Sequence, residues 1–216
     1  PTQIRRALKI PQKTFEEAKA DFDAINNVDI YGISQSIRGA KFPMSVDPFM
    51  LSKELTPQID SLGRAGIGTG HDNFLNGIIV QFDLTCSNKM WTELQRYHFI
   101  DFVSSQSTMH RAARMNLDEA FNEYVHPAIK DVCLGLQDAY NAKPSPEAFL
   151  QLVYSLPAGL ELTARMTTNY RQLKTIYHQR RDHRLPEWRV FCEWLEELPD
   201  SQWITGGDYV RKPKEV

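Results

Sequence analysis

Two stretches of the chain alternate hydrophobic and polar residues with the two-residue period of a β-strand. The first, residues 77–86, presents these apolar side chains on one face: Val80, Phe82, Leu84 and Cys86. The second, residues 160–168, presents Leu160, Leu162, Ala164 and Met166 in the same way. We therefore predict two strands, each with one face on a hydrophobic core and a polar face opposite.

Capping residues and helical apolar spacing predict several helices around these strands. Ser87 or Asn88 would cap a helix through residues 90–98, directly after the first strand. Residues 116–119 have the form of a capping box, which predicts a long helix with this apolar stripe: Leu117, Phe121, Tyr124, Ala128, Val132 and Leu136. Another helix is expected over residues 14–26.

The C-terminal third of the chain contains further helix signals. Ser145 and Pro146 start a helix that Pro157 ends. Asn169 follows the second strand and would cap a helix through residues 170–180. Pro186 suits the first turn of a final helix that runs to Leu198.

The order of strands and helices is mixed, which predicts an α+β or mixed α/β fold. At 216 residues the chain suits one structural domain. Within that domain we distinguish an N-terminal helix and extended region at residues 1–64, a core at 65–200 and a C-terminal tail at 201–216.

Composition and charge exclude several classes of protein. The hydrophobic fraction of 42% and the charged fraction of 24% are ordinary for a globular protein. The net charge of −2 disfavours a nucleic-acid-binding protein, because local basic runs at residues 4–9 and 178–184 have acidic neighbours. No GxGxxG, P-loop or HExxH motif occurs, so we expect neither a Rossmann nor a P-loop site, and no protein-built metal site.

Three cysteines lie far apart in the chain, at Cys86, Cys133 and Cys192. Their odd number and the absence of a CxxC pair fit a reducing cytosol, so a cytoplasmic location is expected. No apolar run approaches the ~18 residues that span a bilayer. No signal-peptide pattern opens the sequence, and because it starts at Pro1 we expect the true N-terminus to lie upstream.

Four segments combine polar side chains with special backbone geometry: residues 70–73, 96–111, 169–171 and 180–184. An arginine and the backbone N–H groups at the start of a helix can face one anion, as at Asn169 and Arg171. Each segment alone also has an ordinary structural explanation. Glu93 and Arg96, three residues apart on a helix, would form a surface ion pair; the other segments would be turns, solvated loops or core aromatics.

Taken in order, these segments resemble the flavin-dependent thymidylate synthases, the ThyX family. The matching residues are Gly70, His71, Arg96, Leu156, Pro157, Asn169, Arg171, Leu173, Arg180 and, one residue late, Trp188. Arg96 stands 26 residues after Gly70, as the first arginine of the family signature does. Arg180 stands eleven residues after Asn169, as the family's late arginine does. The resemblance covers residues 65–200.

The signature itself is only partly present. Tyr97 and His98 stand where the family has histidine and arginine. Ser107 is the best counterpart of the second signature serine, provided that one residue has been inserted, and Arg111 lies too late to be the closing arginine.

The nucleotide side departs further from the family pattern. Val153 replaces an arginine that contacts the nucleotide, and Glu93 replaces a glutamine. The late histidine is either His183 or replaced by Arg184. The resemblance therefore implies a weakened site for a nucleotide phosphate and a better preserved flavin site.

The resemblance implies a ThyX-like fold, with an antiparallel or mixed sheet and flanking helices, in a homotetramer that binds FAD. It places flavin contacts on His71, Asn73, Arg96, His98, Asn169 and Arg171. It places contacts to a pyrimidine deoxynucleotide such as dUMP on Glu93, Ser104, Ser105, Ser107 and Arg180. Arg180, at the pyrimidine, and His71 are the catalytic candidates. Since the family uses no protein nucleophile, the protein positions and polarises its substrates.

Three functions remain open. The first is a transferase that moves a methyl or hydroxymethyl group from methylenetetrahydrofolate to the nucleotide, with FAD as cofactor and NADPH as reductant. The second is a ThyX-fold protein that has lost catalysis and serves as a binding or assembly module. The third, nucleic-acid binding through the basic loops, is disfavoured by the net charge.

Overall fold

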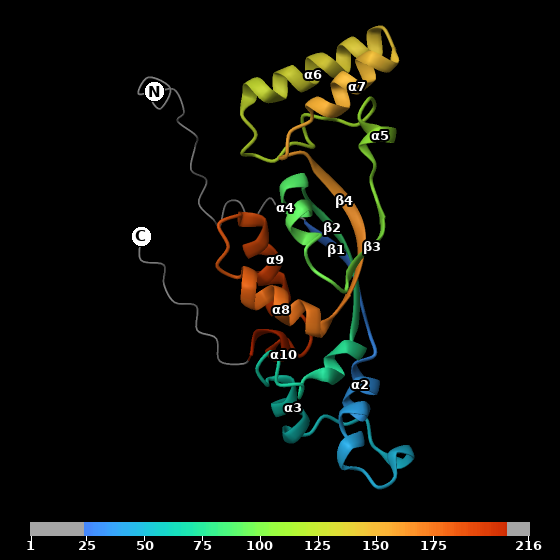
Figure 1. Ribbon diagram of the computed structural model, residues 1–216, viewed down its shortest axis with the longest axis vertical. Coiled ribbons are helices and arrows are strands. Elements are labelled where there is room, and N and C mark those ends of the chain that lie inside the picture. The colour runs from blue at the N-terminus through green and yellow to red at the C-terminus, as the bar shows by residue number, and fades with distance from the viewer. Residues whose placement is uncertain (1–23, 207–216) are drawn as a thin grey trace, which may run out of the picture.

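A four-stranded antiparallel sheet organises the computed structural model, which describes residues 24–206 (Figure 1). The strand order is β1-β2-β4-β3. The strands are β1 (Ile25–Tyr31), β2 (Ile79–Ser87), β3 (Ile100–Ser105) and β4 (Glu161–Asn169). The predicted α+β class and the two predicted strands, β2 and β4, are confirmed. Of the two edge strands, β1 begins inside the predicted N-terminal helix and continues into the region predicted as extended, and β3 was not predicted.

One face of the sheet carries the main hydrophobic core. The apolar residues predicted to share a face of β2 are all buried, as are Ala164 and Met166 of β4. Helices α4 (Asn88–Leu94), α8 (Tyr170–Arg180) and α9 (Pro186–Glu196) contribute the opposing side chains. The ring of Phe82 lies 4.8 Å from that of Trp194, between ring centroids. The opposite face carries polar pairs, including a hydrogen bond between the hydroxyls of Thr85 and Thr163.

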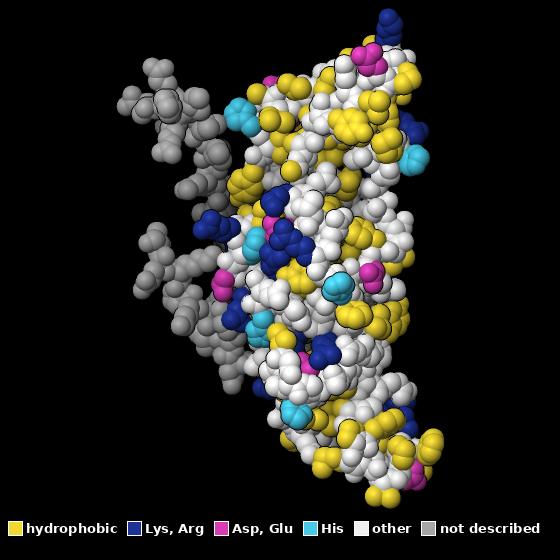
Figure 2. Space-filling model, viewed as in Figure 1, with side chains coloured by type: hydrophobic (Ala, Val, Ile, Leu, Met, Phe, Trp, Pro, Cys, Tyr) yellow, Lys and Arg dark blue, Asp and Glu magenta, His cyan; other side chains and the backbone are white. Residues whose placement is uncertain are grey.

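A second, smaller hydrophobic cluster lies at one end of the molecule, under α6 (Pro127–Ala142) and α7 (Pro146–Ser155) (Figure 1). Its buried members are Ala112, Leu117, Phe121, Cys133, Leu152 and Leu160. The other end is formed by α2 (Ile33–Ala40), α3 (Pro57–Gly63) and the 3-10 helices η2 (Phe42–Met44) and η3 (Pro48–Met50). Exposed hydrophobic side chains gather at this second end (Figure 2).

The long helix predicted from Asn116 begins instead at Pro127, so that prediction is wrong in its first eleven residues. Pro127 lacks the N–H that a helix interior requires, and it fits the first helical position. The His126 side chain caps α6 by accepting from the N–H of Ala128 (3.2 Å). Upstream, Phe121 pairs with Leu160 in an isolated β-bridge, so its burial comes from a strand contact and not from a helix stripe.

The helix predicted for residues 90–98 is shorter than expected. Ser87 caps α4 as predicted, with its hydroxyl accepting from the N–H of Met90 (3.2 Å), but the helix ends at Leu94. Phe99 then adopts φ 62°, which no α-helix contains, and the chain turns into β3. The hydroxyl-rich segment after Arg96 is therefore an edge strand, followed by the short helix α5 (Thr108–Arg111).

The remaining helix starts agree with the sequence. Ser145 caps α7, Asn169 caps α8 and Pro186 lies in the first turn of α9. The last predicted helix ends at Glu196, and a short α10 (Gln202–Thr205) follows it. Of the helix predicted over residues 14–26, residues 14–23 lie outside the described chain, and the residues from Ile25 onward belong to β1.

All three cysteines are free thiols and buried. Within residues 24–206, no helix is both long and apolar enough to cross a bilayer. No group of three potential metal-ligating side chains occurs in the same described part of the chain.

Candidate functional site

The C-terminal end of β4 is the point where the flavin-side segments meet. Asn169 pairs with Ile79 at the start of β2, and Thr168 pairs with Ile100 at the start of β3. The Thr168 hydroxyl also donates to the carbonyl of Phe99 (2.8 Å). The segments that precede β2 and β3 therefore arrive at the end of the sheet where α8 begins.

A buried ion pair holds the segment before β2 against α8. Asp72 is 1% exposed, and its Oδ2 accepts from Nζ of Lys174 (3.2 Å). Lys174 also donates to the carbonyls of Gly63 (2.9 Å) and Ala65, so it ties three segments together. Burial lowers the pKa of Lys174, and the hydrogen bond and charge of Asp72 oppose that shift. Arg171 lies on the other side, with Nε 3.4 Å from Asp72 Oδ1.

The side chains around this pair point outward. His71 and Asn73 flank Asp72 and are exposed, as are Arg96 and His98 before β3. Asn169 accepts from the N–H of Gln172 (2.9 Å) through Oδ1, which leaves its amide N–H groups for other partners. The six residues predicted to contact flavin thus lie on segments that meet at one end of the sheet.

The donors at this end suit an anionic cofactor. Arg96 and Arg171 supply guanidinium groups, His71 and His98 supply imidazoles, and α8 begins here with its N–H groups. The nearby carboxylate, Asp72, is buried and already paired with Lys174. The donor chemistry therefore fits the pyrophosphate and polar ring edge of FAD.

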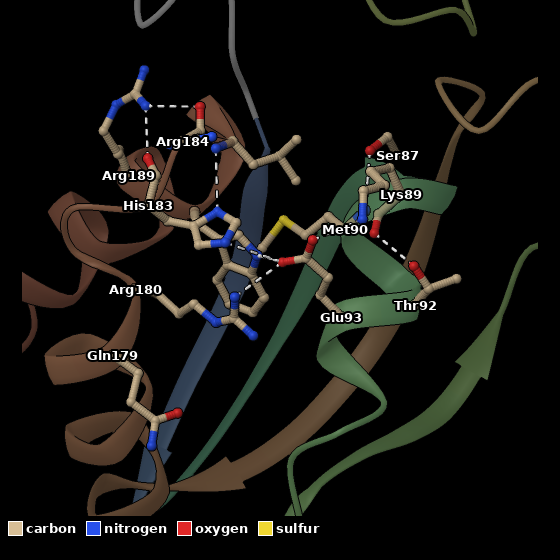
Figure 3. Close-up of polar contacts among 12 residues, drawn as sticks. Ser87, Lys89, Met90, Thr92, Glu93, Gln179, Arg180, His183, Arg184 and Arg189 are labelled. Atoms are coloured by element: carbon tan, nitrogen blue, oxygen red, sulfur yellow. Dashed lines mark hydrogen bonds and ion pairs between the residues drawn. The ribbon is translucent and has the colours of Figure 1, made fainter.

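A second polar cluster surrounds Glu93 of α4 (Figure 3). Glu93 is 8% exposed, and its Oε1 accepts from Nζ of Lys89 (2.8 Å). Its Oε2 accepts from Nη1 of Arg180 and from Nε1 of Trp188, each at 3.0 Å. Burial raises the pKa of Glu93, but hydrogen bonds from Lys89 and Trp188 outweigh burial, and the net shift is downward. Glu93 is therefore ionised at neutral pH, and it pairs with Lys89 and Arg180 instead of Arg96.

Arg180 is held on three sides. Its Nε donates to the hydroxyl of Tyr97 (2.7 Å), and its guanidinium carbon lies 4.8 Å from the ring centroid of Trp188. The Tyr97 hydroxyl donates in turn to Oε1 of Gln179 (2.9 Å). Burial raises the pKa of Tyr97, so the phenol stays neutral. A guanidinium has five N–H donors; Nε and one N–H of Nη1 are used, and the others have no hydrogen-bond partner in residues 24–206.

His183 closes the cluster on the α9 side. Its Nδ1 accepts from the N–H of Leu185 (3.2 Å), so in the neutral ring the proton sits on Nε2. That Nε2 lies 3.4 Å from Oε2 of Glu93. Burial lowers the pKa of His183 against the opposing charge of Glu93. The structure thus places His183 beside Glu93 and Arg180, whereas Arg184 is exposed.

The predicted phosphate contacts lie elsewhere on the chain. Ser104 and Ser105 are exposed at the far end of β3, roughly 13 Å along the strand from Ile100 at 3.3 Å per residue. Ser107 follows at the start of α5, where its side chain makes no capping hydrogen bond. Val153 packs against the second hydrophobic cluster, so it takes no part in phosphate binding. Within a single chain, these serines do not lie beside Arg180.

Four members of the Glu93 cluster were missed from the sequence: Lys89, Tyr97, Gln179 and Trp188. The spacing of Lys89 and Glu93, four residues apart in a predicted helix, was an available signal for an ion pair. Trp188 and Tyr97 occupied positions of the family pattern but were not predicted as site residues, because aromatic residues near a helix end are more often core.

A cavity of about 760 Å³ lies between the two hydrophobic clusters. Its walls include Val125 and Ile129 on one side and Leu185 and Val190 on the other. It shares Lys89 with the Glu93 cluster, but its lining, as residues 24–206 form it, contains none of the predicted site residues. The cavity therefore adjoins the Glu93 cluster at Lys89, and its lining includes none of the proposed flavin contacts at the end of β4.

The fold is that of the ThyX proteins. Two crystal structures of the flavin-dependent thymidylate synthase ThyX from Helicobacter pylori, each with FAD and dUMP, are similar to this chain. The first has a TM-score of 0.64 at 16% identity and covers 87% of this chain and 100% of its own. The second has a TM-score of 0.61 at 15% identity and covers 86% and 97%. No protein-family model and no curated protein sequence matches the chain.

Proposed function

We propose that this protein is a flavin-dependent transferase that moves a methyl or hydroxymethyl group from methylenetetrahydrofolate to a pyrimidine deoxynucleotide such as dUMP. The observation that carries the proposal is the meeting of three sequence segments at the end of β4, in a ThyX-like fold. A cytoplasmic location and NADPH as reductant belong to the same proposal.

The proposed flavin contacts are His71, Asn73, Arg96, His98, Asn169 and Arg171. When bound, FAD supplies the hydride chemistry that the side chains of this chain lack. The protein binds and orients: Arg96 and Arg171 neutralise the anionic part of the cofactor, and the Asp72–Lys174 pair keeps His71 and Asn73 in place beside them. His71, exposed at this end, is the catalytic candidate nearest the cofactor.

Arg180 is the proposed pyrimidine contact and the second catalytic candidate. Its unused N–H groups can donate to a ring carbonyl and stabilise charge that develops there. Ser104, Ser105 and Ser107 remain the proposed phosphate contacts, and they require an assembly in which another subunit brings its β3 near Arg180. Exposed Phe99, Phe102 and Val103 on and beside this edge strand support burial in a homotetramer.

Turnover tests the proposal directly. Protein loaded with FAD is incubated with dUMP, methylenetetrahydrofolate and NADPH, and the nucleotide product is identified by its mass. A methylated or hydroxymethylated pyrimidine is expected, and its mass tells the two transfers apart. Production by wild type and loss in Arg180→Ala would support the assignment.

The second candidate function is a ThyX-fold binding or assembly module without catalysis. The half-buried Val153, which packs against the second hydrophobic cluster, favours it, because no arginine occupies that position. Protein that binds FAD but forms no product under the turnover conditions is the outcome expected of this module.

A further inference from the structure

Glu93 changes the chemical character of Arg180. The two side chains meet at 3.0 Å with exposed fractions of only 11% and 14%, so solvent screens the pair weakly. A guanidinium in open water attracts phosphate as a cation. Here a carboxylate already lies against it, and part of the positive charge of Arg180 is compensated.

Two further titratable groups lie against Glu93. Lys89 donates to Oε1, the carboxylate oxygen that does not bind Arg180, and its side chain is 53% exposed, so water screens its charge more than that of Arg180. His183 carries no charge at neutral pH, because its pKa is lowered by burial. The carboxylate of Glu93 is therefore shared between Arg180 on the buried side and Lys89 on the exposed side.

The orientation of Arg180 is also fixed. Glu93 holds Nη1 and Tyr97 holds Nε, while the rings of Tyr97 and Trp188 lie 5.4 and 4.8 Å from the guanidinium carbon. Figure 3 shows Arg180 and His183 converging on Glu93 from the α8 side. The unused N–H groups thus form a rigid donor edge whose positive charge is reduced by Glu93, which matches a neutral carbonyl better than a phosphate.

We propose that Glu93 is a positioning residue that partly compensates the charge of Arg180 and orients its N–H donors, which makes Arg180 selective for an uncharged pyrimidine carbonyl over a phosphate. This inference rests on the proposed function and deepens it, since it assigns the base and not the phosphate to Arg180. It also changes the role of Glu93, from a residue expected to touch the nucleotide to one that acts through Arg180.

The test compares two probes, deoxyuridine and inorganic phosphate, on FAD-supplemented protein. Binding is measured by calorimetry and by NMR of the indole N–H of Trp188. The resonance is assigned by its disappearance in the Trp188→Phe variant. That N–H donates to Glu93 and so reports on the cluster. Wild type is expected to bind deoxyuridine with a shift of this resonance, whereas phosphate should bind weakly and leave the resonance unshifted.

Glu93→Gln keeps the shape and removes the charge. It is expected to weaken deoxyuridine binding about tenfold and to strengthen phosphate binding about tenfold, as for the gain or loss of one net hydrogen bond of about 1.4 kcal/mol. Glu147→Gln, the same change at an exposed position in α7, is the matched control and should alter neither.

Tyr97→Phe separates orientation from charge, and it keeps the test valid should Glu93→Gln fail to fold. It removes the acceptor of Nε but leaves Glu93, so deoxyuridine binding should weaken without any gain for phosphate. A gain for phosphate in Tyr97→Phe would overturn the inference.

Two further results are distinguishable. Equal binding of both probes by wild type and Glu93→Gln would overturn the role of Glu93 and leave the proposed function standing. Failure of wild-type protein to bind deoxyuridine, despite bound FAD, would contradict the pyrimidine site of the proposed function itself.

Discussion

The two polar groups of this protein use buried charge in opposite ways. At the end of β4, the buried pair of Asp72 and Lys174 fixes the backbone, and the side chains proposed to bind the cofactor lie around it, exposed or half-buried. In the Glu93 cluster, the buried contacts hold the proposed ligand-binding side chain, Arg180, itself. The first arrangement suits a large cofactor with many weak contacts, and the second suits one small, directional contact.

The largest effect is expected from breaking the backbone clamp. Lys174→Met leaves buried Asp72 with the half-exposed Arg171, at 3.4 Å, in place of its buried cation, and it leaves the carbonyls of Gly63 and Ala65 without the Lys174 donor. Removing one partner of a buried pair costs about 3–5 kcal/mol of unfolding free energy. Urea unfolding should show this loss, and adding Asp72→Asn to Lys174→Met should restore part of it. Stability unchanged in Lys174→Met would contradict the clamp.

The next effect concerns the exposed cofactor residues. Arg96→Ala should lower FAD affinity by about 10- to 100-fold, which corresponds to one charge-assisted hydrogen bond of about 1.5–3 kcal/mol. Its stability should not change, because the side chain is exposed. Arg111→Ala, an exposed arginine of α5 outside both groups, is the control and should bind FAD normally. Equal affinities in the two variants would remove Arg96 from the site.

Some elements of the fold could be predicted from the sequence and others could not. Strict alternation revealed β2 and β4, and Asn169 and Pro186 revealed the helices after them. The edge strand β3 and the start and pairing of β1 were missed because long-range pairing defines edge strands. In β3, Phe99 reverses the chain so that Phe102 lies opposite Met166.

For the candidate site, the sequence identified individual residues but not the contacts between them. The family spacing identified Glu93 and Arg180 separately, but they are 87 residues apart in the chain and no local pattern indicates their contact. The role of Lys174 was equally hidden, because a lysine in an amphipathic helix is ordinarily exposed. The capping-box pattern at Asn116 misled because Pro127 determines where that helix begins.

A smaller effect tests how Glu187, in the first turn of α9, anchors α4. Ser87 caps α4 and its hydroxyl donates to Oε2 of Glu187 (2.8 Å). Ser87→Ala should cost about 1–2 kcal/mol of unfolding free energy. Ser145→Ala removes only a cap, from α7, so the difference between the two variants isolates the bond to Glu187. A larger loss in Ser145→Ala would be inconsistent with that anchor.

The smallest effect is the pH dependence of stability, to which Glu93 and Glu187 contribute with opposite sign. The pKa of Glu93 is lowered in the folded protein, so its contribution to stability is present above the ordinary glutamate pKa and is lost as pH falls through the folded pKa. The pKa of Glu187 is raised by burial, so its contribution is present below the ordinary pKa and is lost as pH rises through the folded pKa.

Urea unfolding between about pH 3 and 7 separates these contributions. Glu93→Gln should flatten the acidic limb of the stability curve, and Glu187→Gln should flatten the decline above the ordinary glutamate pKa. Identical curve shapes in wild type and both variants would show that neither carboxyl titrates as described.

Flavin binding by the purified protein tests the central claim most directly. Titration with FAD should give saturable uptake and a flavin absorption band, and addition of dUMP should perturb that band in wild type more than in Arg180→Ala. Protein that stays colourless and takes up no FAD would contradict the proposed function, whatever its fold.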